Sequence, residues 1–179
     1  MCSKFSAFFS LLLLAFELTQ TYTKFEFTNV ICTCLDKSFL SFEYCYLKSI
    51  NRTYKFGSIK VNLYKAPVSK IRLNLAIYQR LNGYKPFLYN VTIDACKFLA
   101  NNKSSPVARF IFNLFGPYSN INHTCPYNNP IIVDKAPTSH MDYQLTNVLP
   151  FPKGQYGFHS IWTVYGIQRA HVNVYGTLS

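Results

Sequence analysis

The chain of 179 residues carries 18 lysines and arginines against 7 aspartates and glutamates, which gives a formal net charge of +11. Aromatic residues make up 17% and charged residues 14% of the chain, a balance that excludes intrinsic disorder and leaves ring surface for an apolar cavity. The positive residues stand singly rather than in blocks, so we expect no nucleic-acid partner; a solvated polar face is the simplest interpretation, and attraction to an anionic surface is the alternative.

Residues 1–22 have the pattern of a secretory signal peptide. An almost wholly apolar run, Phe5–Leu18, follows a short basic end, and the chain then turns polar. The run is shorter than the roughly 20 apolar residues that a spanning helix needs, although a retained signal anchor is the alternative. We expect cleavage between Thr19 and Thr23, no transmembrane segment, and an extracellular, secreted product with one domain over residues 23–179.

Five cysteines remain once Cys2 leaves with the signal peptide. In an oxidising compartment they favour disulfides over metal binding. Cys32 and Cys34 lack the two-to-four-residue gap of a zinc knuckle, and no second pair follows. An odd number leaves one thiol over.

The strand pattern suggests how the cysteines pair. Residues 24–34 and 39–49 are interpreted as an antiparallel hairpin, which brings Cys45 near Cys32 or Cys34, since these two share one face of a strand. We favour Cys32–Cys45, with Cys34 left free. The second pair is then Cys96–Cys125, of which the first ends a strand and the second lies in a loop.

Period-two alternation of apolar and polar residues predicts strands over most of the chain. The clearest unit is a hairpin, in which Ile71–Ile77 and Phe87–Ile93 point alternate side chains inward and Asn82-Gly83 predicts a type I′ turn. Leu40, Phe42, Tyr44 and Tyr46 are expected to share a face. Further strands are expected at residues 59–63, 155–168 and 170–177.

One segment has helical spacing instead. Ser105-Pro106 supplies an N-cap and a favourable first position, and Gly116-Pro117 ends the segment. Residues 126–153 are predicted to be irregular, with an edge strand and long loops. Antiparallel strands with one short helix and two disulfides predict an all-β, immunoglobulin-like sandwich, either tightly packed or splayed around an apolar slot.

Four glycosylation sequons occur in the chain, at Asn51, Asn90, Asn102 and Asn122. Together with a signal peptide they predict a glycoprotein. Asn90 is the best placed, because it lies on the polar side of its strand.

The sequence holds no known catalytic motif. It lacks a nucleophile elbow, an H-E-x-x-H pair, a phosphate-binding glycine loop and a dinucleotide fingerprint. His159 and His171 could meet on neighbouring strands, but no acidic residue is placed beside them, and Cys34 has no histidine nearby in sequence. We therefore expect a protein that is not an enzyme, with no catalytic residues, no metal site and no cofactor.

Several motifs, taken together, resemble those of a known family. They are Phe39-x-x-Phe42-x-x-Cys45-x-Leu47-Lys48-Ser49-x-Asn51-Arg52-Thr53, Leu81-Asn82-Gly83-Tyr84-Lys85-Pro86-Phe87-Leu88-Tyr89-Asn90, Asp94-Ala95-Cys96-Lys97-Phe98-Leu99, Asn122-His123-Thr124-Cys125-Pro126-Tyr127, Leu149-Pro150-Phe151-Pro152 with Gly154-x-Tyr156, and Val172-x-Val174-Tyr175-Gly176. This set resembles an uncharacterised insect family of small secreted proteins that includes the CheB-type chemosensory proteins. The family is similar to a divergent branch of the ML lipid-recognition fold, akin to the ganglioside-activator protein.

The resemblance implies an apolar cavity between two sheets and a lipid or long-chain hydrocarbon ligand, with a role in pheromone sensing for some members and a membrane receptor or channel as a further partner. It also implies that Cys34, which replaces the family's usual serine, is the unpaired thiol. We predict a secreted lipid-binding protein that sequesters its ligand; the alternative is a non-catalytic extracellular interaction module with a filled core. Candidate cavity residues are Leu73, Leu75, Ile77, Phe87, Tyr89, Val91, Phe110, Phe115 and Trp162.

Overall fold

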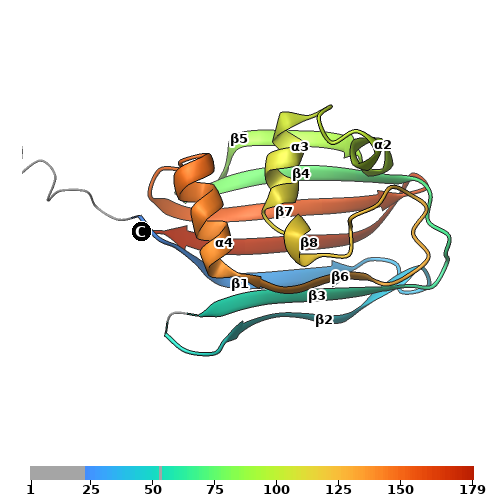
Figure 1. Ribbon diagram of the computed structural model, residues 1–179, viewed down its shortest axis with the longest axis horizontal. Helices are drawn as coiled ribbons and strands as arrows, with labels where there is room; N and C mark the ends of the chain where they lie inside the picture. Colours follow the sequence, from blue (N-terminus) through green and yellow to red (C-terminus); the bar gives the residue numbers. More distant parts are fainter. Residues whose placement is uncertain (1–22, 53) are drawn as a thin grey trace, which may run out of the picture.

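The structure, a computed structural model, describes residues 23–52 and 54–179 and consists of two layers (Figure 1). The predicted signal peptide and Thr53 lie outside the described residues. The first layer is a five-stranded antiparallel sheet in the order β1-β8-β7-β4-β5, and the second contains a three-stranded sheet in the order β2-β3-β6. The strands are β1 (Phe25–Cys34), β2 (Leu40–Ser49), β3 (Lys55–Leu63), β4 (Ile71–Leu81), β5 (Gly83–Asp94), β6 (Ile131–Pro137), β7 (Gly154–Val164) and β8 (Ile167–Leu178).

Short helices complete the second layer. Figure 1 shows α2 (Ala95–Ala100) and α3 (Pro106–Asn113) lying over β4, β5 and β7, and α4 (Thr138–Tyr143) crossing β7 and β8 toward β1, beside the smaller sheet. A 3₁₀ turn, η1 (Gly116–Tyr118), follows α3, and a π-helical turn, η2 (Gln144–Val148), continues α4. Among the described residues, none of the helices is long and apolar enough to cross a membrane.

The predicted antiparallel sandwich is confirmed, but the expectation of a single helix is wrong. The expected helix is α3, where Ser105 accepts a hydrogen bond from the amide of Ala108. Helices α2 and α4 are each six residues long, too short to produce a helical period in the sequence. The irregular region does contain the expected edge strand, β6.

The expected hairpin of residues 24–34 and 39–49 is wrong. β1 pairs with β8, whereas β2 pairs with β3 in the opposite sheet. The turn between them is fixed by Asp36, whose carboxylate forms an ion pair with Arg169 of β8, and by Phe39, which is buried beneath the same guanidinium. These contacts send the chain across the sandwich rather than back along the same sheet.

Two irregularities alter other expectations. A register shift between Phe42 and Tyr44 breaks the face that residues 40–46 were expected to share, because beyond it Cys45 pairs with Ile59. At the other turn, Gly83 has a φ of +88°, but Asn82 does not have a positive φ. A type I′ turn needs positive φ at both central residues, so that prediction is wrong.

The ends of the described chain lie side by side. Lys24 and Ser179 exchange two backbone hydrogen bonds of 3.1 Å, which extend the pairing of β1 with β8.

The core between the layers is divided into two clusters. We call them the Phe25 cluster and the Phe39 cluster. The first comprises Phe25, Phe27, Ile77, Leu114, Met141, Leu145, Phe151, Tyr156 and Leu178. The second comprises Phe39, Leu40, Val61, Val68, Tyr127, Ile131, Val164 and Ala170.

Candidate binding cavity

A cavity of about 220 Å³ lies between the two layers, bordered by members of both core clusters. Leu75, Val172 and Ile111 are buried but belong to neither cluster, and all three line the cavity. Interiors normally pack without voids larger than a water molecule, so a space of this size is unusual in a core. The cavity is the leading candidate for a functional site.

Small residues from both sheets account for the space. On β7, Ser160 pairs with Leu75 on one side and Val172 on the other, so a short side chain stands in the middle of an apolar row. On the facing sheet, Gly57 of β3 pairs with Ala136 of β6, and both border the cavity. Side chains with so few atoms cannot fill the distance of about 10 Å between stacked layers.

Three polar or hydroxyl-bearing side chains that border the cavity, those of Ser160, Trp162 and Tyr127, already have hydrogen-bond partners within the protein. Ser160 Oγ donates to the carbonyl of Val172 at 3.0 Å and accepts from Trp162 Nε1 at 3.0 Å. The Tyr127 hydroxyl donates to the carbonyl of His123. Because these groups are already hydrogen-bonded, they do not offer a partner to a polar group of a ligand, and the wall is suited to a hydrocarbon.

His159 also borders the cavity, but its side chain lies on the other side of the sheet. It is the neighbour of Phe158 and Ser160, which face inward, so it must face outward. Its ring packs on Tyr78 with centroids 4.6 Å apart. Burial lowers the pKa of His159, which keeps the imidazole neutral at pH 7.

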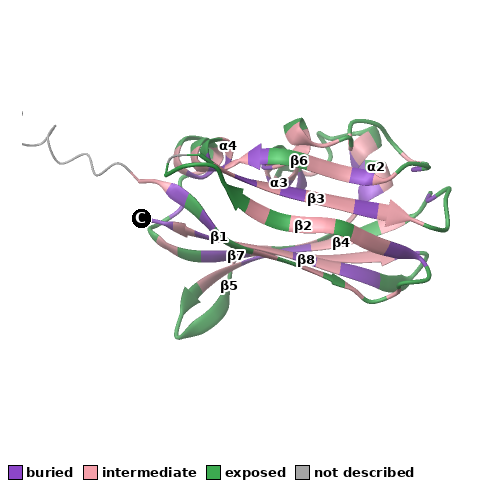
Figure 2. Ribbon diagram, turned by 90° about the horizontal axis from the view of Figure 1, so that it is seen from below, coloured by how far each residue is buried: buried purple, intermediate pink, exposed green. Residues whose placement is uncertain are grey.

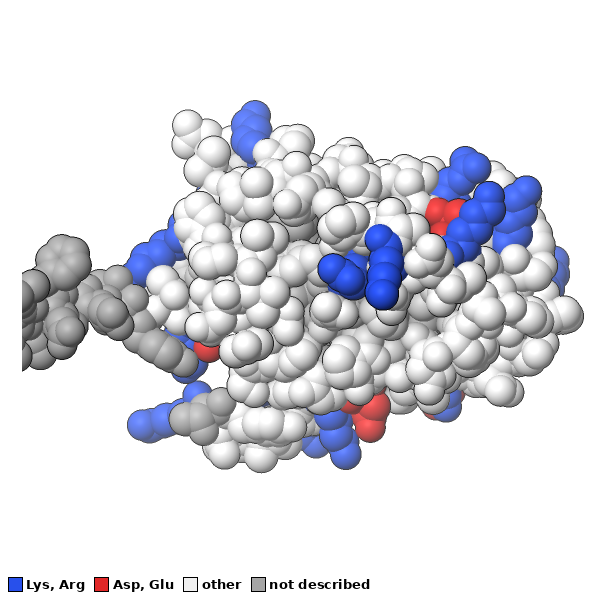
Figure 3. All heavy atoms as spheres, turned by 45° about the horizontal axis from the view of Figure 1, so that its top comes forward, with Lys and Arg blue, Asp and Glu red and all other residues white. Residues whose placement is uncertain are grey.

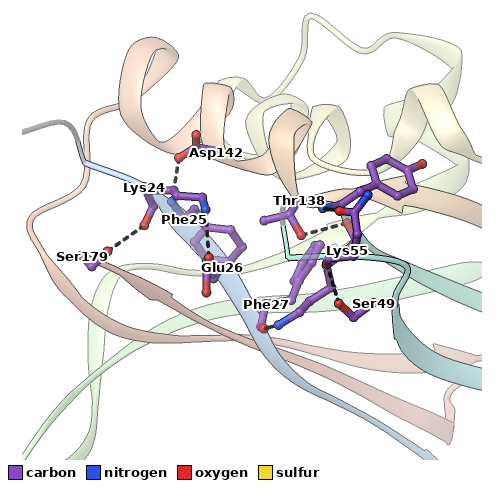
Figure 4. A network of polar contacts seen from close by, with 11 residues as sticks. Lys24, Phe25, Glu26, Phe27, Ser49, Lys55, Thr138, Asp142 and Ser179 are labelled. Carbon is purple, nitrogen blue, oxygen red and sulfur yellow. Dashed lines mark hydrogen bonds and ion pairs between the residues drawn. The ribbon is translucent and has the colours of Figure 1, made fainter.

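One end of the cavity is closed by α4, which a polar network holds against β1 and β3 (Figure 4). The amide of Phe25 donates to Asp142 Oδ1 at 2.6 Å, and Thr138 Oγ1 donates to the carbonyl of Lys55 at 2.9 Å. The Lys55 ammonium in turn donates to the carbonyl of Phe27. Met141 of α4, which is fixed by this network, lines the cavity.

Five of the nine candidate cavity residues line the space. They are Leu73, Leu75, Ile77, Phe115 and Trp162. The other four do not. Phe87, Tyr89 and Phe110 pack against the Phe25 cluster, where α3 covers the inner face of β5, and Val91 is half-buried on the same strand. Ring contacts such as Phe110–Phe151, at 6.1 Å, fill the space that these residues were expected to leave open.

The sequence interpretation missed the wall that the smaller sheet contributes. Ile59, Val61 and Leu63 of β3 and Val133 of β6 line the cavity. Their alternation was visible in the sequence, but nothing there showed that β3 faces β4 and β7 across the sandwich. Gly57 was missed for a different reason, because a glycine within a strand has no side chain to reveal a cavity.

Both expected disulfides are present, and Cys34 is free. Cys32–Cys45 joins β1 to β2, so it connects the two sheets rather than the two strands of a hairpin. Cys96–Cys125 ties α2 to the loop that precedes β6. The thiol of Cys34 donates to the carbonyl of Leu40 at 3.2 Å.

The remaining candidate sites lie on the surface. The four sequon asparagines, Asn51, Asn90, Asn102 and Asn122, are all exposed, and their glycosylation stays a prediction. In the part of the chain that the structure describes, no three His, Cys, Asp or Glu side chains are grouped as metal ligands. Lysine and arginine side chains stand apart or in small groups on the face shown in Figure 3, where most of the surface is uncharged.

Comparison with known proteins gives a family match and distant structural matches. Residues 73–158 match the family described as "Protein of unknown function (DUF1091)". A search of curated proteins finds no match. One structural match is the crystal structure of a Niemann-Pick type C2 protein from the Japanese carpenter ant. The match covers 86% of this chain and 90% of the ant protein, with 9% sequence identity and a TM-score of 0.30. A similarity this distant carries no conclusion, and the sandwich assignment rests on the strand order and pairing above.

Proposed function

We propose that this protein is a secreted carrier that holds the apolar part of a lipid or hydrocarbon between its two layers. The observation that carries the proposal is the cavity of about 220 Å³, whose bordering polar side chains are already hydrogen-bonded or turned away. An apolar cavity of about 150 Å³ in another protein stays dry and binds benzene. Scaled from those six carbons, the space here accommodates about nine.

The size of the cavity sets the expected affinity. About nine buried carbons, at roughly 0.8 kcal/mol each, stabilise a complex by about 7 kcal/mol before ordering costs are subtracted. This corresponds to dissociation constants of micromolar or weaker. A longer chain either extends out of the cavity or requires the second layer to move. The polar end of such a ligand would lie outside, because the wall offers it no partner.

The resemblance to the CheB-type family supports one class of ligand in particular. Pheromone hydrocarbons and lipids combine a long apolar chain with few polar atoms, which is the chemistry that this wall accommodates. We place the protein in chemosensory signalling on that ground, with a membrane receptor or channel as the partner that would receive the ligand. We propose no catalytic role, because no aspartate or glutamate lines the cavity and Ser160 is already hydrogen-bonded.

Trp162 offers a direct test, since it is the sole tryptophan of the chain and lines the cavity. Titration with fatty acids and alkanols of increasing chain length should change its emission saturably, with affinity rising until the chain exceeds the cavity. Val172→Phe would fill the space and should abolish the change. Val148→Phe is the matched control, because Val148 is 51% exposed and lies away from the wall.

Two outcomes would overturn the proposal. One is an emission of Trp162 that does not respond to any apolar ligand while the protein is folded. The other is equal binding by Val172→Phe and the wild type. The alternative of an interaction module with a filled core is not favoured by the structure, because the described core contains the cavity.

A further inference from the structure

The outer face of the five-stranded sheet carries a group of aromatic rings. Figure 2 shows the smaller sheet and the helices on the opposite side, so no described element covers this face. Tyr78, Tyr84, His159 and Tyr175 form one group, which we call the ring platform. Centroid distances are 4.6 Å for Tyr78–His159, 5.4 Å for His159–Tyr175 and 5.6 Å for Tyr84–Tyr175.

The platform depends on a glycine and is electrically neutral. A Cβ at Gly157 would lie 2.9 Å from His159 Nε2 and 3.2 Å from Tyr175 Cε1, so the bare backbone leaves room for these two rings, which meet edge to face at 75°. Burial holds the pKa of His159 below its ordinary value, and the other members are tyrosines. An uncharged aromatic surface is suited to the C–H faces of a sugar, because the ring face is the negative side of its quadrupole.

Asn90 of β5 stands beside this platform on the same face. It pairs with Ala76 of β4, which pairs with His159 of β7, so Asn90 and His159 are two strands, or about 10 Å, apart. Tyr78 is two residues along β4 from Ala76, beyond a register shift after which Tyr78 pairs with Pro86. In the row that these pairs form, the small residue Ala76 stands between Asn90 and His159.

The amide of Asn90 is oriented for attachment. Its Oδ1 accepts a hydrogen bond from Asn74 Nδ2 at 2.9 Å, and the same Asn74 amide donates to Thr92 Oγ1 at 3.0 Å. Nδ2, the atom that carries an N-linked glycan, makes no hydrogen bond with the described residues. The sequon is therefore exposed, and its reactive nitrogen is free.

From this arrangement we infer that the ring platform is the docking site for the proximal sugar of an N-glycan on Asn90, with Tyr78 as the main contact. The inference rests on the secretion that the proposed function includes. The glycan covers the aromatic surface, which on an exported carrier would otherwise expose a contiguous patch to other proteins. The sugar is attached to this chain, so no external partner is required.

The test begins with protein secreted from a eukaryotic host that adds high-mannose glycans. Peptide mass spectrometry measures the occupancy of Asn90, and endoglycosidase H then leaves a single sugar at each site. The midpoint of thermal unfolding should be unchanged by this trimming. Asn90→Gln should lower it by about 2–4 °C, the shift that accompanies a modest stability change in a domain of this size.

A double-mutant cycle identifies the contact. In a Tyr78→Ala background, Asn90→Gln should produce no further shift, because the ring that holds the sugar is already gone. Asn102→Gln is the matched control, since Asn102 is an exposed sequon residue on a loop after α2 and away from the platform. It should not change the midpoint in either background. Equal shifts for Asn90→Gln in the two backgrounds would overturn the inference.

A second measurement does not depend on the folding of the Tyr78 variant. In wild-type protein trimmed to one sugar per site, the C–H protons of the sugar on Asn90 should show ring-current shifts in NMR spectra. Those on Asn102 should not. The absence of such shifts, or an unoccupied Asn90 in secreted protein, would refute the inference. Neither result bears on ligand binding, which the emission of Trp162 reports separately.

Discussion

The two halves of the second layer differ in how they are held. Over β1 and β8, the cavity is covered by β2, β3 and β6, which are joined by continuous strand pairing and attached to β1 by Cys32–Cys45. Over β4 and β5, it is covered by α2 and α3, and α4 closes one end against β1 and β3; the backbone hydrogen bonds of these short helices are internal, so they depend on side-chain contacts. We call these the sheet half and the helical half.

This difference indicates where the proposed ligand would enter. Opening the sheet half would break strand pairs and strain a disulfide, whereas a helix of six to eight residues can shift by giving up a few side-chain contacts. Between α3 and α4, one such contact is the 2.7 Å hydrogen bond between His140 Nε2 and the carbonyl of Asn113. We therefore expect ligand exchange to occur through the helical half.

The largest expected effect comes from removing either disulfide, which tests whether the halves have different roles. The pairs span 13 and 29 residues, so replacing each with serines should lower the free energy of unfolding by about 3–4 kcal/mol, measured by urea denaturation. Only Cys96→Ser with Cys125→Ser should also speed ligand release, because that pair anchors α2. Equally faster release in both double variants would contradict the distinction.

Ser160→Ala tests the sheet that the two halves share. The substitution leaves Trp162 Nε1 without its acceptor beside the cavity, which should cost about 1–3 kcal/mol in unfolding free energy. Trp162 emission should shift to the red if water enters to replace the lost partner. Ser160→Cys, of similar size, serves as the control for volume. An unchanged spectrum and stability would show that the wall does not need this hydrogen bond.

His140→Ala should loosen the helical half with a smaller loss of stability. The lost hydrogen bond corresponds to about 1 kcal/mol and to a several-fold faster release of ligand, followed by stopped-flow fluorescence of Trp162. Tyr143→Ala is the control on the same helix, since its side chain is 57% exposed. If His140→Ala released ligand at the wild-type rate, the ligand would not enter at the contact between α3 and α4.

The smallest expected effect is a dependence of the unfolding free energy on pH. It arises from His159 on β7, in the sheet that both halves cover. Burial lowers the pKa of His159 below 6.5, so in mild acid the unfolded chain takes up a proton that the folded chain does not. The stability is then fully present above pH 6.5 and falls as the pH drops toward the folded-state pKa. His159→Gln should weaken this fall in thermal unfolding scans. A variant with the wild-type slope would show that another group causes it.

The sequence predicted the sheets well but not how they face each other. Alternation in 71–77 and 87–93 identified β4 and β5, because side chains in a strand alternate between a dry and a wet face. The same alternation could not show that β1 and β2 lie in opposite sheets, because two consecutive strands with one apolar face each are equally consistent with a hairpin in one sheet. The ion pair of Asp36 with Arg169, which decides the matter, joins residues 133 apart in sequence.

The cavity was only half predictable for a related reason. The sequence allowed Leu73, Leu75 and Trp162 to be assigned to the wall, because large apolar side chains on the inner face of a sheet point into the space between the layers. Which of the inner residues pack against a helix depends on α3, whose rings fill the space over β5. The volume itself comes from small residues, and a small residue in a sequence is equally consistent with tight packing.

The paired chain ends have an engineering consequence. Because Lys24 and Ser179 are hydrogen-bonded to each other, a short peptide could join them and link β8 covalently to β1, its neighbour in the sheet. New ends could then be opened at the exposed turn around Asn82, between β4 and β5. Such a circular permutant would place a fluorescent fusion at the end of the large sheet, where it could report movements of β4 and β5 on addition of a ligand.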